Sequence, residues 1–261
     1  MLKDFSKETF DIIIQAGQSN AEGSGFGPAS EPWVPDDRVY CLEPDMTLTR
    51  ATERVCGNRI QSNFALAFAR DYIRSGLLAP GRKLLILRSA VGGTGFLDGR
   101  WHMEGDLYLQ MLEMVRTALA LNRENRLVAL LWHQGETDAI LGATREQHRR
   151  HLEDLLTSVR NVFGVPQLPF VAGDFVHHWE QENRAICDGV VGAMRDLCEE
   201  LPYCGFVETD GLKSNAEEGI DHPLGWGNGD IIHFSRPAIY ELGKRYFEAF
   251  TGIAPLPETE S

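Results

Sequence analysis

The sequence predicts an α/β protein in which helices cover both faces of one parallel sheet. Short runs of apolar residues, many of them β-branched, show no polar alternation, which is typical of strands buried on both faces. Segments with apolar residues at helical spacing alternate with these runs along the chain. The loops rich in polar residues and glycine follow strands, so we expect them to gather at the carboxyl edge of the sheet.

Length and composition predict a single domain spanning residues 1–261. The chain has 261 residues, is 43% hydrophobic and 24% charged, and contains no internal repeat or low-complexity tract. Its formal net charge of −13 argues against nucleic acid or an anionic membrane as a partner, because the charge repels polyanions. No apolar run approaches the length of a transmembrane helix.

The cysteines and the amino terminus predict a cytoplasmic protein. Five cysteines form an odd set without a C-x-x-C pair, which favours a reducing compartment and offers no zinc-site spacing. The first strand begins by residue 11, which leaves no room for a signal peptide, although a chain trimmed of its leader would look the same. We expect neither a metal nor another cofactor.

The first predicted strand ends in a polar turn. Residues 12–14 are isoleucines, and the turn that follows contains Gly17, Gln18, Ser19 and Asn20. A serine in this position is a candidate nucleophile, because the preceding glycine lets the backbone turn sharply. The alternative is that Ser19 is a helix N-cap, which is a common role for serine.

A long irregular segment separates this turn from the first long helix. Residues 26–60 are punctuated by prolines, with one short strand expected at residues 39–42. A connection of this length inside a domain is usually a binding loop or a lid. A helix is expected over residues 63–75, with one apolar stripe and Gly76 at its end.

Two further buried strands each lead into a polar loop. A strand at residues 84–87 runs into the glycine-rich residues 89–95, and Asp106 is placed to cap the next helix. A strand at residues 127–131 leads into W-H-Q-G-E-T-D at residues 132–138. Both loops therefore belong to the edge that carries Ser19.

The last part of the chain continues the alternation. Thr144 and Gln147 form a capping box at the start of a helix. Two short strands are expected at residues 170–172 and 206–207, with a helix at residues 185–199 between them. A final helix is expected after Ser235, with Pro237 in its first turn.

Acyl transfer by serine needs a base, a group that orients the base, and donors for the developing oxyanion. Among eight histidines, His233 stands out because Asp230 precedes it in the loop before the final helix. A carboxylate there can accept from Nδ1–H and leave Nε2 for the serine. D-x-x-H alone is a weak signal. The other histidines considered are His177 and His178 after a strand, His222 in a proline- and glycine-rich loop, and His148 and His151 on a solvated helix face.

Oxyanion donors are predicted in the loops after the second and third buried strands. Gly92 and Gly93 lack side chains, so a substrate can approach their backbone N–H groups. Gln134 offers a neutral amide donor. The alternatives are a simple turn for the glycines and a strand-end hydrogen bond for Gln134.

The four motifs together resemble a known family. G-Q-S-N at residues 17–20, V-G-G-T at 91–94, W-H-Q-G-E-T-D at 132–138 and D-x-x-H at 230–233 occur in the order found in SGNH hydrolases. Within them, the chain is similar to the sialic-acid-specific acetylesterase-like group, which includes the acetylxylan esterases of carbohydrate esterase family six. The resemblance implies a flavodoxin-like three-layer α/β/α fold and hydrolysis of acetyl esters on sugars without a metal.

The resemblance also implies a role for each site residue. Ser19 would be the nucleophile, His233 the general base and Asp230 the residue that orients it. The Ser19 amide, the Gly93 amide and the Gln134 side chain would form the oxyanion hole. The supporting residues would be Gln18, Asn20, Gly92 and Glu136. We expect Glu136 to hold the Ser19 loop through backbone amides, although it is the alternative to Asp230 as the acid of the triad.

The substrate is less determined than the chemistry. Residues 95–100 depart from the family pattern beside the expected acyl pocket, so the acetylated sugar, from sialic acid to xylan-derived oligosaccharide, stays open, as does the oligomeric state. One alternative is a lipase or thioesterase that acts on longer acyl esters, with Trp33, Phe96 and Trp226 lining an acyl pocket. Another is a non-catalytic carbohydrate-binding module.

Overall fold

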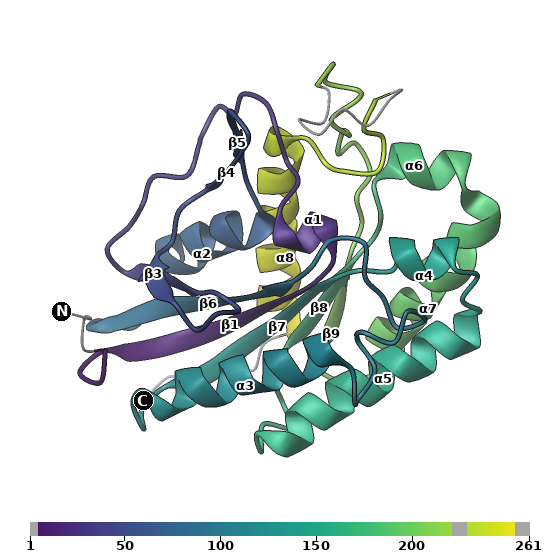
Figure 1. Cartoon of the computed structure of the whole chain (residues 1–261). Coiled ribbons are helices and arrows are strands. Elements are labelled where there is room, and N and C mark those ends of the chain that lie inside the picture. Colours follow the sequence, from purple (N-terminus) through teal and green to yellow (C-terminus); the bar gives the residue numbers. More distant parts are fainter. Residues whose placement is uncertain (1–4, 221–228, 254–261) are drawn as a thin grey trace.

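The computed structural model describes residues 5–220 and 229–253, and its centre is a seven-stranded sheet in the order β3-β2-β6-β1-β7-β8-β9 (Figure 1). Neighbouring strands are parallel except for the antiparallel pair of β2 and β3. The strands are β1 (Thr9–Gly17), β2 (Val39–Leu42), β3 (Leu48–Arg50), β6 (Arg82–Ala90), β7 (Arg126–His133), β8 (Phe170–Gly173) and β9 (Cys204–Val207). A separate hairpin consists of β4 (Arg54–Cys56) and β5 (Arg59–Gln61).

Helices cover both faces of the sheet, which confirms the predicted three-layer α/β/α arrangement. On one face α2 and α8 pack against each other, and on the other face lie α3, α5 and α7 (Figure 1). Three shorter helices, α1, α4 and α6, follow the ends of strands. The helices are α1 (Ser19–Glu22), α2 (Phe64–Arg74), α3 (Asp106–Ala120), α4 (Glu136–Ile140), α5 (Arg145–Val162), α6 (His177–Glu182), α7 (Arg184–Glu200) and α8 (Arg236–Ile253).

The position of β1 explains its uniformly apolar sequence. It lies between β6 and β7 with helices on both faces, so the side chains of Ile12, Ile13 and Ile14 are completely buried. Burial of each isoleucine contributes about 1.5–3 kcal/mol of transfer free energy. Burial on both faces explains the apolar runs of the other central strands in the same way. The predicted strands are confirmed at residues 12–14, 39–42, 84–87, 127–131, 170–172 and 206–207.

The predicted long helices are also present. The helix expected over residues 63–75 is α2, and the helix expected after Ser235 is α8, with Pro237 in its first turn. At the start of α5 the capping box is complete, because Gln147 N donates to Thr144 Oγ1 at 3.2 Å and Thr144 N donates to Gln147 Oε1 at 3.1 Å. The predicted capping box is thus confirmed.

The expected cap of α3 is wrong. Asp106 is the first helical residue, Gly105 occupies the N-cap, and no side-chain cap bond forms. Instead, Asp106 Oδ2 accepts a hydrogen bond from Arg100 Nη2 at 2.6 Å. The nearby arginine competes with the backbone N–H groups for the carboxylate.

The shortest elements escaped prediction. The segment 26–60 contains β3, β4 and part of β5 besides the expected β2, and α1, α4 and α6 have only four, five and six residues. Helices of one or two turns show no usable apolar period. Within the described part of the chain, no helix combines the length and apolar character needed to cross a membrane. His222 and Trp226 lie outside the described residues.

Candidate active site

The carboxyl ends of β1 and β7 meet closely at the edge of the sheet. Gly17 pairs with His133 in register, and a Cβ at Gly17 would lie 2.1 Å from the carbonyl oxygen of His133. Gly17 also has a φ of +134°, a conformation that favours glycine. The two strands therefore deliver α1 and α4 to the same edge (Figure 1).

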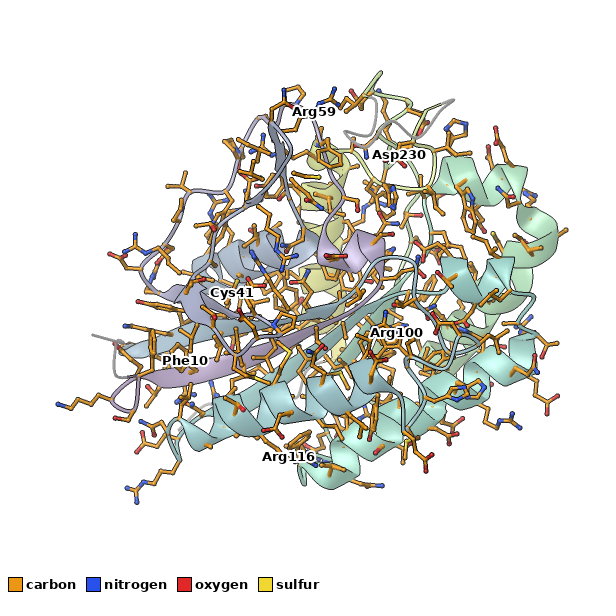
Figure 2. All side chains as sticks on the ribbon, in the orientation of Figure 1. Phe10, Cys41, Arg59, Arg100, Arg116 and Asp230 are labelled. Carbon is orange, nitrogen blue, oxygen red and sulfur yellow. The ribbon has the colours of Figure 1, made fainter. Side chains whose placement is uncertain are left out.

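Ser19, His233 and Asp230 form a continuous hydrogen-bonded chain. Ser19 Oγ lies 2.8 Å from His233 Nε2, and His233 Nδ1 lies 2.7 Å from Asp230 Oδ1. Asp230 and His233 are almost completely buried, whereas Ser19 is partly exposed. Ser19 is the first residue of α1 and Gln18 occupies the N-cap position, so Ser19 is not the cap of that helix. Figure 2 shows Asp230 in the loop that precedes α8.

A residue that sequence reasoning missed fixes Asp230. Asn215 Nδ2 donates to Asp230 Oδ2 at 2.9 Å and to the carbonyl oxygen of Ser24 at 2.9 Å. Both oxygens of the carboxylate are thus engaged, one by Asn215 and the other by His233. Asn215 belongs to no local motif, so nothing in its sequence context indicated this role.

Asn20 connects the serine helix to the histidine loop. Its Nδ2 donates to Glu136 Oε1 at 2.8 Å and to the carbonyl oxygen of Ile232 at 3.0 Å, and its Oδ1 accepts from Phe234 N at 3.2 Å. Asn20 therefore holds the backbone on both sides of His233.

Glu136 contacts the serine helix, but not in the expected way. It accepts from the Asn20 side chain, and within the described residues no backbone amide of the Ser19 loop is seen to donate to it. Its second oxygen, Oε2, is buried without a hydrogen-bond partner among the described atoms. Burial raises the pKa of the Glu136 carboxyl, because a charge is poorly solvated there. Glu136 Oε1 accepts from Asn20, whereas the Nδ1 of His233 lies against Asp230.

Gly92 and Gly93 lie beside Ser19. A Cβ at Gly92 would be 3.4 Å from Ser19 Cβ, and Gly92 N donates to Glu22 Oε2 at 2.8 Å. Gly93 is exposed and has a φ of +68°. Glu22 Oε1 also lies 3.5 Å from Nη1 of Arg54, so the segment 26–60 contacts the turn through this ion pair.

Gln134 has acceptors other than the expected oxyanion. The residue is completely buried, and its Nε2 donates to Asp138 Oδ2 at 2.8 Å and to the carbonyl oxygen of Thr94 at 3.2 Å. Both amide hydrogens are therefore directed at protein atoms. Gln18 Oε1 lies 3.4 Å from the same nitrogen and accepts from Thr137 N at 3.1 Å.

The other histidines occupy different surroundings. The expectation that His148 is solvated is wrong, because its side chain is completely buried, with Nδ1 3.4 Å from Asp138 Oδ2. The loop after β6 covers it, and the Phe96 ring packs edge-on at 5.5 Å between centroids. His177 and His178 belong to α6, where they lie near Glu180 and Glu182. In the described ranges, no group of three or more His, Cys, Asp or Glu residues is arranged to hold a metal ion.

Residues 9–252 match a family model described as carbohydrate esterase, sialic acid-specific acetylesterase. The chain belongs to this family. One relative is a probable carbohydrate esterase of Arabidopsis thaliana, 25% identical over 182 residues, which are 61% of this chain and 66% of the relative. Another is a probable 9-O-acetyl-N-acetylneuraminic acid deacetylase of Escherichia coli, 28% identical over 121 residues, which are 38% and 37% of the two chains. The chain thus matches less than two thirds of either curated relative.

Solved structures confirm the fold of this carbohydrate esterase family member. NanS has a TM-score of 0.80 at 19% identity, with 94% of this chain and 98% of NanS covered. The Arabidopsis thaliana protein has a TM-score of 0.73 at 19% identity, covering 94% and 99%. A carbohydrate acetylesterase of Xanthomonas citri has a TM-score of 0.61 at 17% identity, covering 94% and 56%. At these identities the likeness concerns the fold.

Two aromatic residues suggested for an acyl pocket are not available to line one in this family member. Trp33 is 7% exposed, and its Nε1 donates to the carbonyl oxygen of Ala51. Phe96 is 1% exposed and stacks on Trp132. Trp226 lies outside the described residues. Both described rings belong to the core, because apolar surface is most stable away from water.

Proposed function

We propose that this protein is a single-domain serine esterase that removes O-acetyl groups from carbohydrates. The observation that carries the proposal is the chain of contacts from Ser19 Oγ to His233 Nε2, 2.8 Å, and from His233 Nδ1 to Asp230 Oδ1, 2.7 Å. This geometry is that of an activated serine nucleophile, and it occurs in a member of a carbohydrate esterase family.

The proposed reaction has two steps and passes through an acetyl-serine. Ser19 Oγ attacks the ester carbonyl carbon while His233 Nε2 takes the hydroxyl proton, and the Asp230 carboxylate stabilises the imidazolium. The backbone N–H groups of Ser19 and Gly93 donate to the oxyanion. His233 then gives its proton to the departing sugar oxygen. In the second step water, activated by His233, attacks the acetyl carbon, and acetate leaves as Ser19 recovers its proton.

The proposed substrate is a small carbohydrate that bears an O-acetyl group, with acetylated sialic acid ahead of xylan-derived sugars. The family description and the Escherichia coli relative both name sialic acid chemistry. A short acyl group is supported by the burial of Trp33 and Phe96, which removes two of the three aromatic residues suggested for a longer acyl chain. Octanoyl esters should therefore be hydrolysed much more slowly than acetyl esters.

Replacement of Ser19 tests the proposal. The wild-type protein should release acetate from an O-acetylated sialic acid and hydrolyse p-nitrophenyl acetate. Ser19→Ala should lower kcat about 10³-fold or more, and the addition of His233→Ala should lower it little further, because the two residues act as one unit. Ser89→Ala, which removes another buried hydroxyl from this edge of the sheet, should keep wild-type activity. A Ser19→Ala variant that retains most of its activity would refute the proposal.

A further inference from the structure

The loop that carries Gly92 and Gly93 rests on a buried carboxylate outside the proposed triad. Asp138, in α4, is completely buried. Its Oδ1 accepts from Leu97 N at 2.8 Å, and its Oδ2 accepts from Phe96 N at 3.1 Å. One carboxylate thus holds two successive backbone N–H groups at the end of the loop.

Contact between the loop and this carboxylate depends on a glycine. A Cβ at Gly95 would lie 2.7 Å from Asp138 Oδ1 and 2.9 Å from its Cγ. Real Cβ atoms essentially never come so close to other heavy atoms, so with any larger residue the loop and the Asp138 carboxylate would have to move apart. Unlike many glycines in loops, Gly95 is needed for space, because its φ is not in the positive region.

The same carboxylate reaches the other part of the loop through Gln134. Gln134 Nε2 donates to Asp138 Oδ2 at 2.8 Å and to the carbonyl oxygen of Thr94 at 3.2 Å. Thr94 Oγ1 in turn donates to the carbonyl oxygen of Val91 at 2.7 Å. Gly93 therefore lies between Val91 and Thr94, two residues whose carbonyl oxygens are held in place.

His148 completes the surroundings of Asp138. Its Nδ1 lies 3.4 Å from Asp138 Oδ2, and both side chains are completely buried. Burial raises the pKa of Asp138, but the contact with His148 and the backbone N–H groups outweigh it and leave that pKa below its usual value. A buried carboxylate charge is tolerated when both of its oxygens accept hydrogen bonds, as those of Asp138 do.

We propose that Asp138 is a positioning residue that fixes the loop of residues 91–97, so that the Gly93 N–H faces the carbonyl oxygen of an ester at Ser19. This inference rests on the proposed esterase function. It explains why a carboxylate that touches no substrate is buried beneath the loop, and why Gln134 points toward Asp138 and Thr94. Loss of the carboxylate should raise the free energy of the transition state more than that of the bound ester, because the oxyanion forms only in the transition state.

Asp138→Asn tests this role, with Asp11→Asn as the matched control. The asparagine keeps the size of the side chain but must turn an NH₂ group toward a backbone N–H or toward Gln134 Nε2. We expect kcat for an acetyl ester to fall about 10- to 100-fold with KM changed less than about threefold. Asp11 is also completely buried and binds Arg82 Nε at 2.7 Å and Arg126 Nε at 2.6 Å, at the amino end of β1. Its replacement should lower Tm and leave kcat unchanged.

A second variant keeps the inference testable if Asp138→Asn does not fold. Gly95→Ala leaves every polar group in place and only forces the loop away from the carboxylate, so it should show the same loss of kcat. The rate at which a small phosphonate ester labels Ser19, followed by intact mass, should fall in parallel, because that reaction also develops charge on oxygen.

The possible outcomes separate the two proposals. If the wild type fails to hydrolyse any acetyl ester, the proposed function is wrong. If the wild type is active and the folded Asp138→Asn or Gly95→Ala variant retains its kcat, Asp138 is only structural and the inference is overturned. A fall in kcat that Asp11→Asn shares would also overturn it.

Discussion

Two buried carboxylates, Asp230 and Glu136, lie near His233 and were both candidates for the acid of the triad. Asp230 Oδ1 is 2.7 Å from His233 Nδ1, and Asn215 holds its other oxygen. Glu136 Oε1 is bonded by Asn20 instead. Because burial raises the pKa of Glu136, a neutral side chain of the same shape should substitute for it well.

The two carboxylates should therefore respond differently to the same chemical change. Asp230→Asn should lower kcat about 10³- to 10⁴-fold, because the amide cannot hold the required tautomer of His233. Glu136→Gln retains an oxygen for Asn20 Nδ2 and should lower kcat less than about tenfold. The kcat values for an acetyl ester and the circular dichroism of both variants provide the measurement. A larger loss for Glu136→Gln than for Asp230→Asn would reverse the assignment.

Among the elements, the contact between β1 and β7 determines where the candidate site forms. Gly17 is the last residue of β1, and its Cα faces the backbone of His133 without space for a side chain. The glycine thus allows the two strand ends to approach and the chain to turn into α1. Sequence reasoning identified the strand and the turn, but the close approach depends on a strand more than a hundred residues away.

Alanine at Gly17 should be far more destabilising than alanine at Gly76. Gly76 also has a positive φ, +80°, but no atom of the described residues lies within 4 Å of a Cβ there. Gly76→Ala carries a conformational cost of about 1–2 kcal/mol. Gly17→Ala carries a strain of about 1–3 kcal/mol, because its φ of +134° lies where residues other than glycine are rare, and it adds a clash with backbone that typically costs about 1–3 kcal/mol. Urea denaturation of both variants measures the difference in the free energy of unfolding. Equal losses in the free energy of unfolding for the two variants would show that the ends of β1 and β7 separate easily.

On the scale of the whole molecule, the two edges of the sheet differ in their chemistry. At the amino edge, near Phe10 in Figure 2, Asp11 is fully paired with Arg82 and Arg126. At the carboxyl edge, near Asp230, buried carboxylates and histidines lie at the strand ends and in the loops and short helices that follow them. One of these is Asp174, which follows β8 and whose pKa is raised to about 7 by burial and by the charge of Glu180.

Asp174 should make the stability of the protein depend on pH. Its ordinary pKa is 3.8 and its folded value is about 7, so between these pH values the folded protein keeps a proton that the unfolded chain has lost. The resulting stability is present at low pH and is lost as pH rises through about 7.

From pH 5 to pH 8, the free energy of unfolding of the wild type should fall relative to Asp174→Asn. The expected fall exceeds about 1.4 kcal/mol, which corresponds to one pKa unit. His133, whose pKa burial lowers to about 3, has the opposite influence, but it is present in both proteins and cancels in the comparison. Asp188→Asn, which removes an exposed carboxylate, controls for the change in net charge. If the difference in the free energy of unfolding between wild type and Asp174→Asn does not change with pH, the prediction is wrong. Arg195, 3.1 Å away, would then keep Asp174 ionised.

The order of buried strands and long helices could be predicted from the sequence, and with it the edge where the polar loops gather. These features follow from short-range patterns, since strands buried on both faces are continuously apolar and helices repeat their apolar residues every three or four positions. The pairing of Asp230 with His233 was also within reach, because the two residues are three positions apart.

Which side chains meet across the loops could not be predicted without the three-dimensional arrangement of the elements. Ser19 and His233 are separated by 214 positions, and Asn215, Asn20 and Gln134 find their partners on different elements. Burial of His148 and Phe96 likewise depends on how the loop after β6 lies against α5. Hydrogen bonds and burial depend on which residues are close in space, and local periodicity carries no information about that. The orientation of Gln134 toward Asp138 could therefore be seen only in the packed structure.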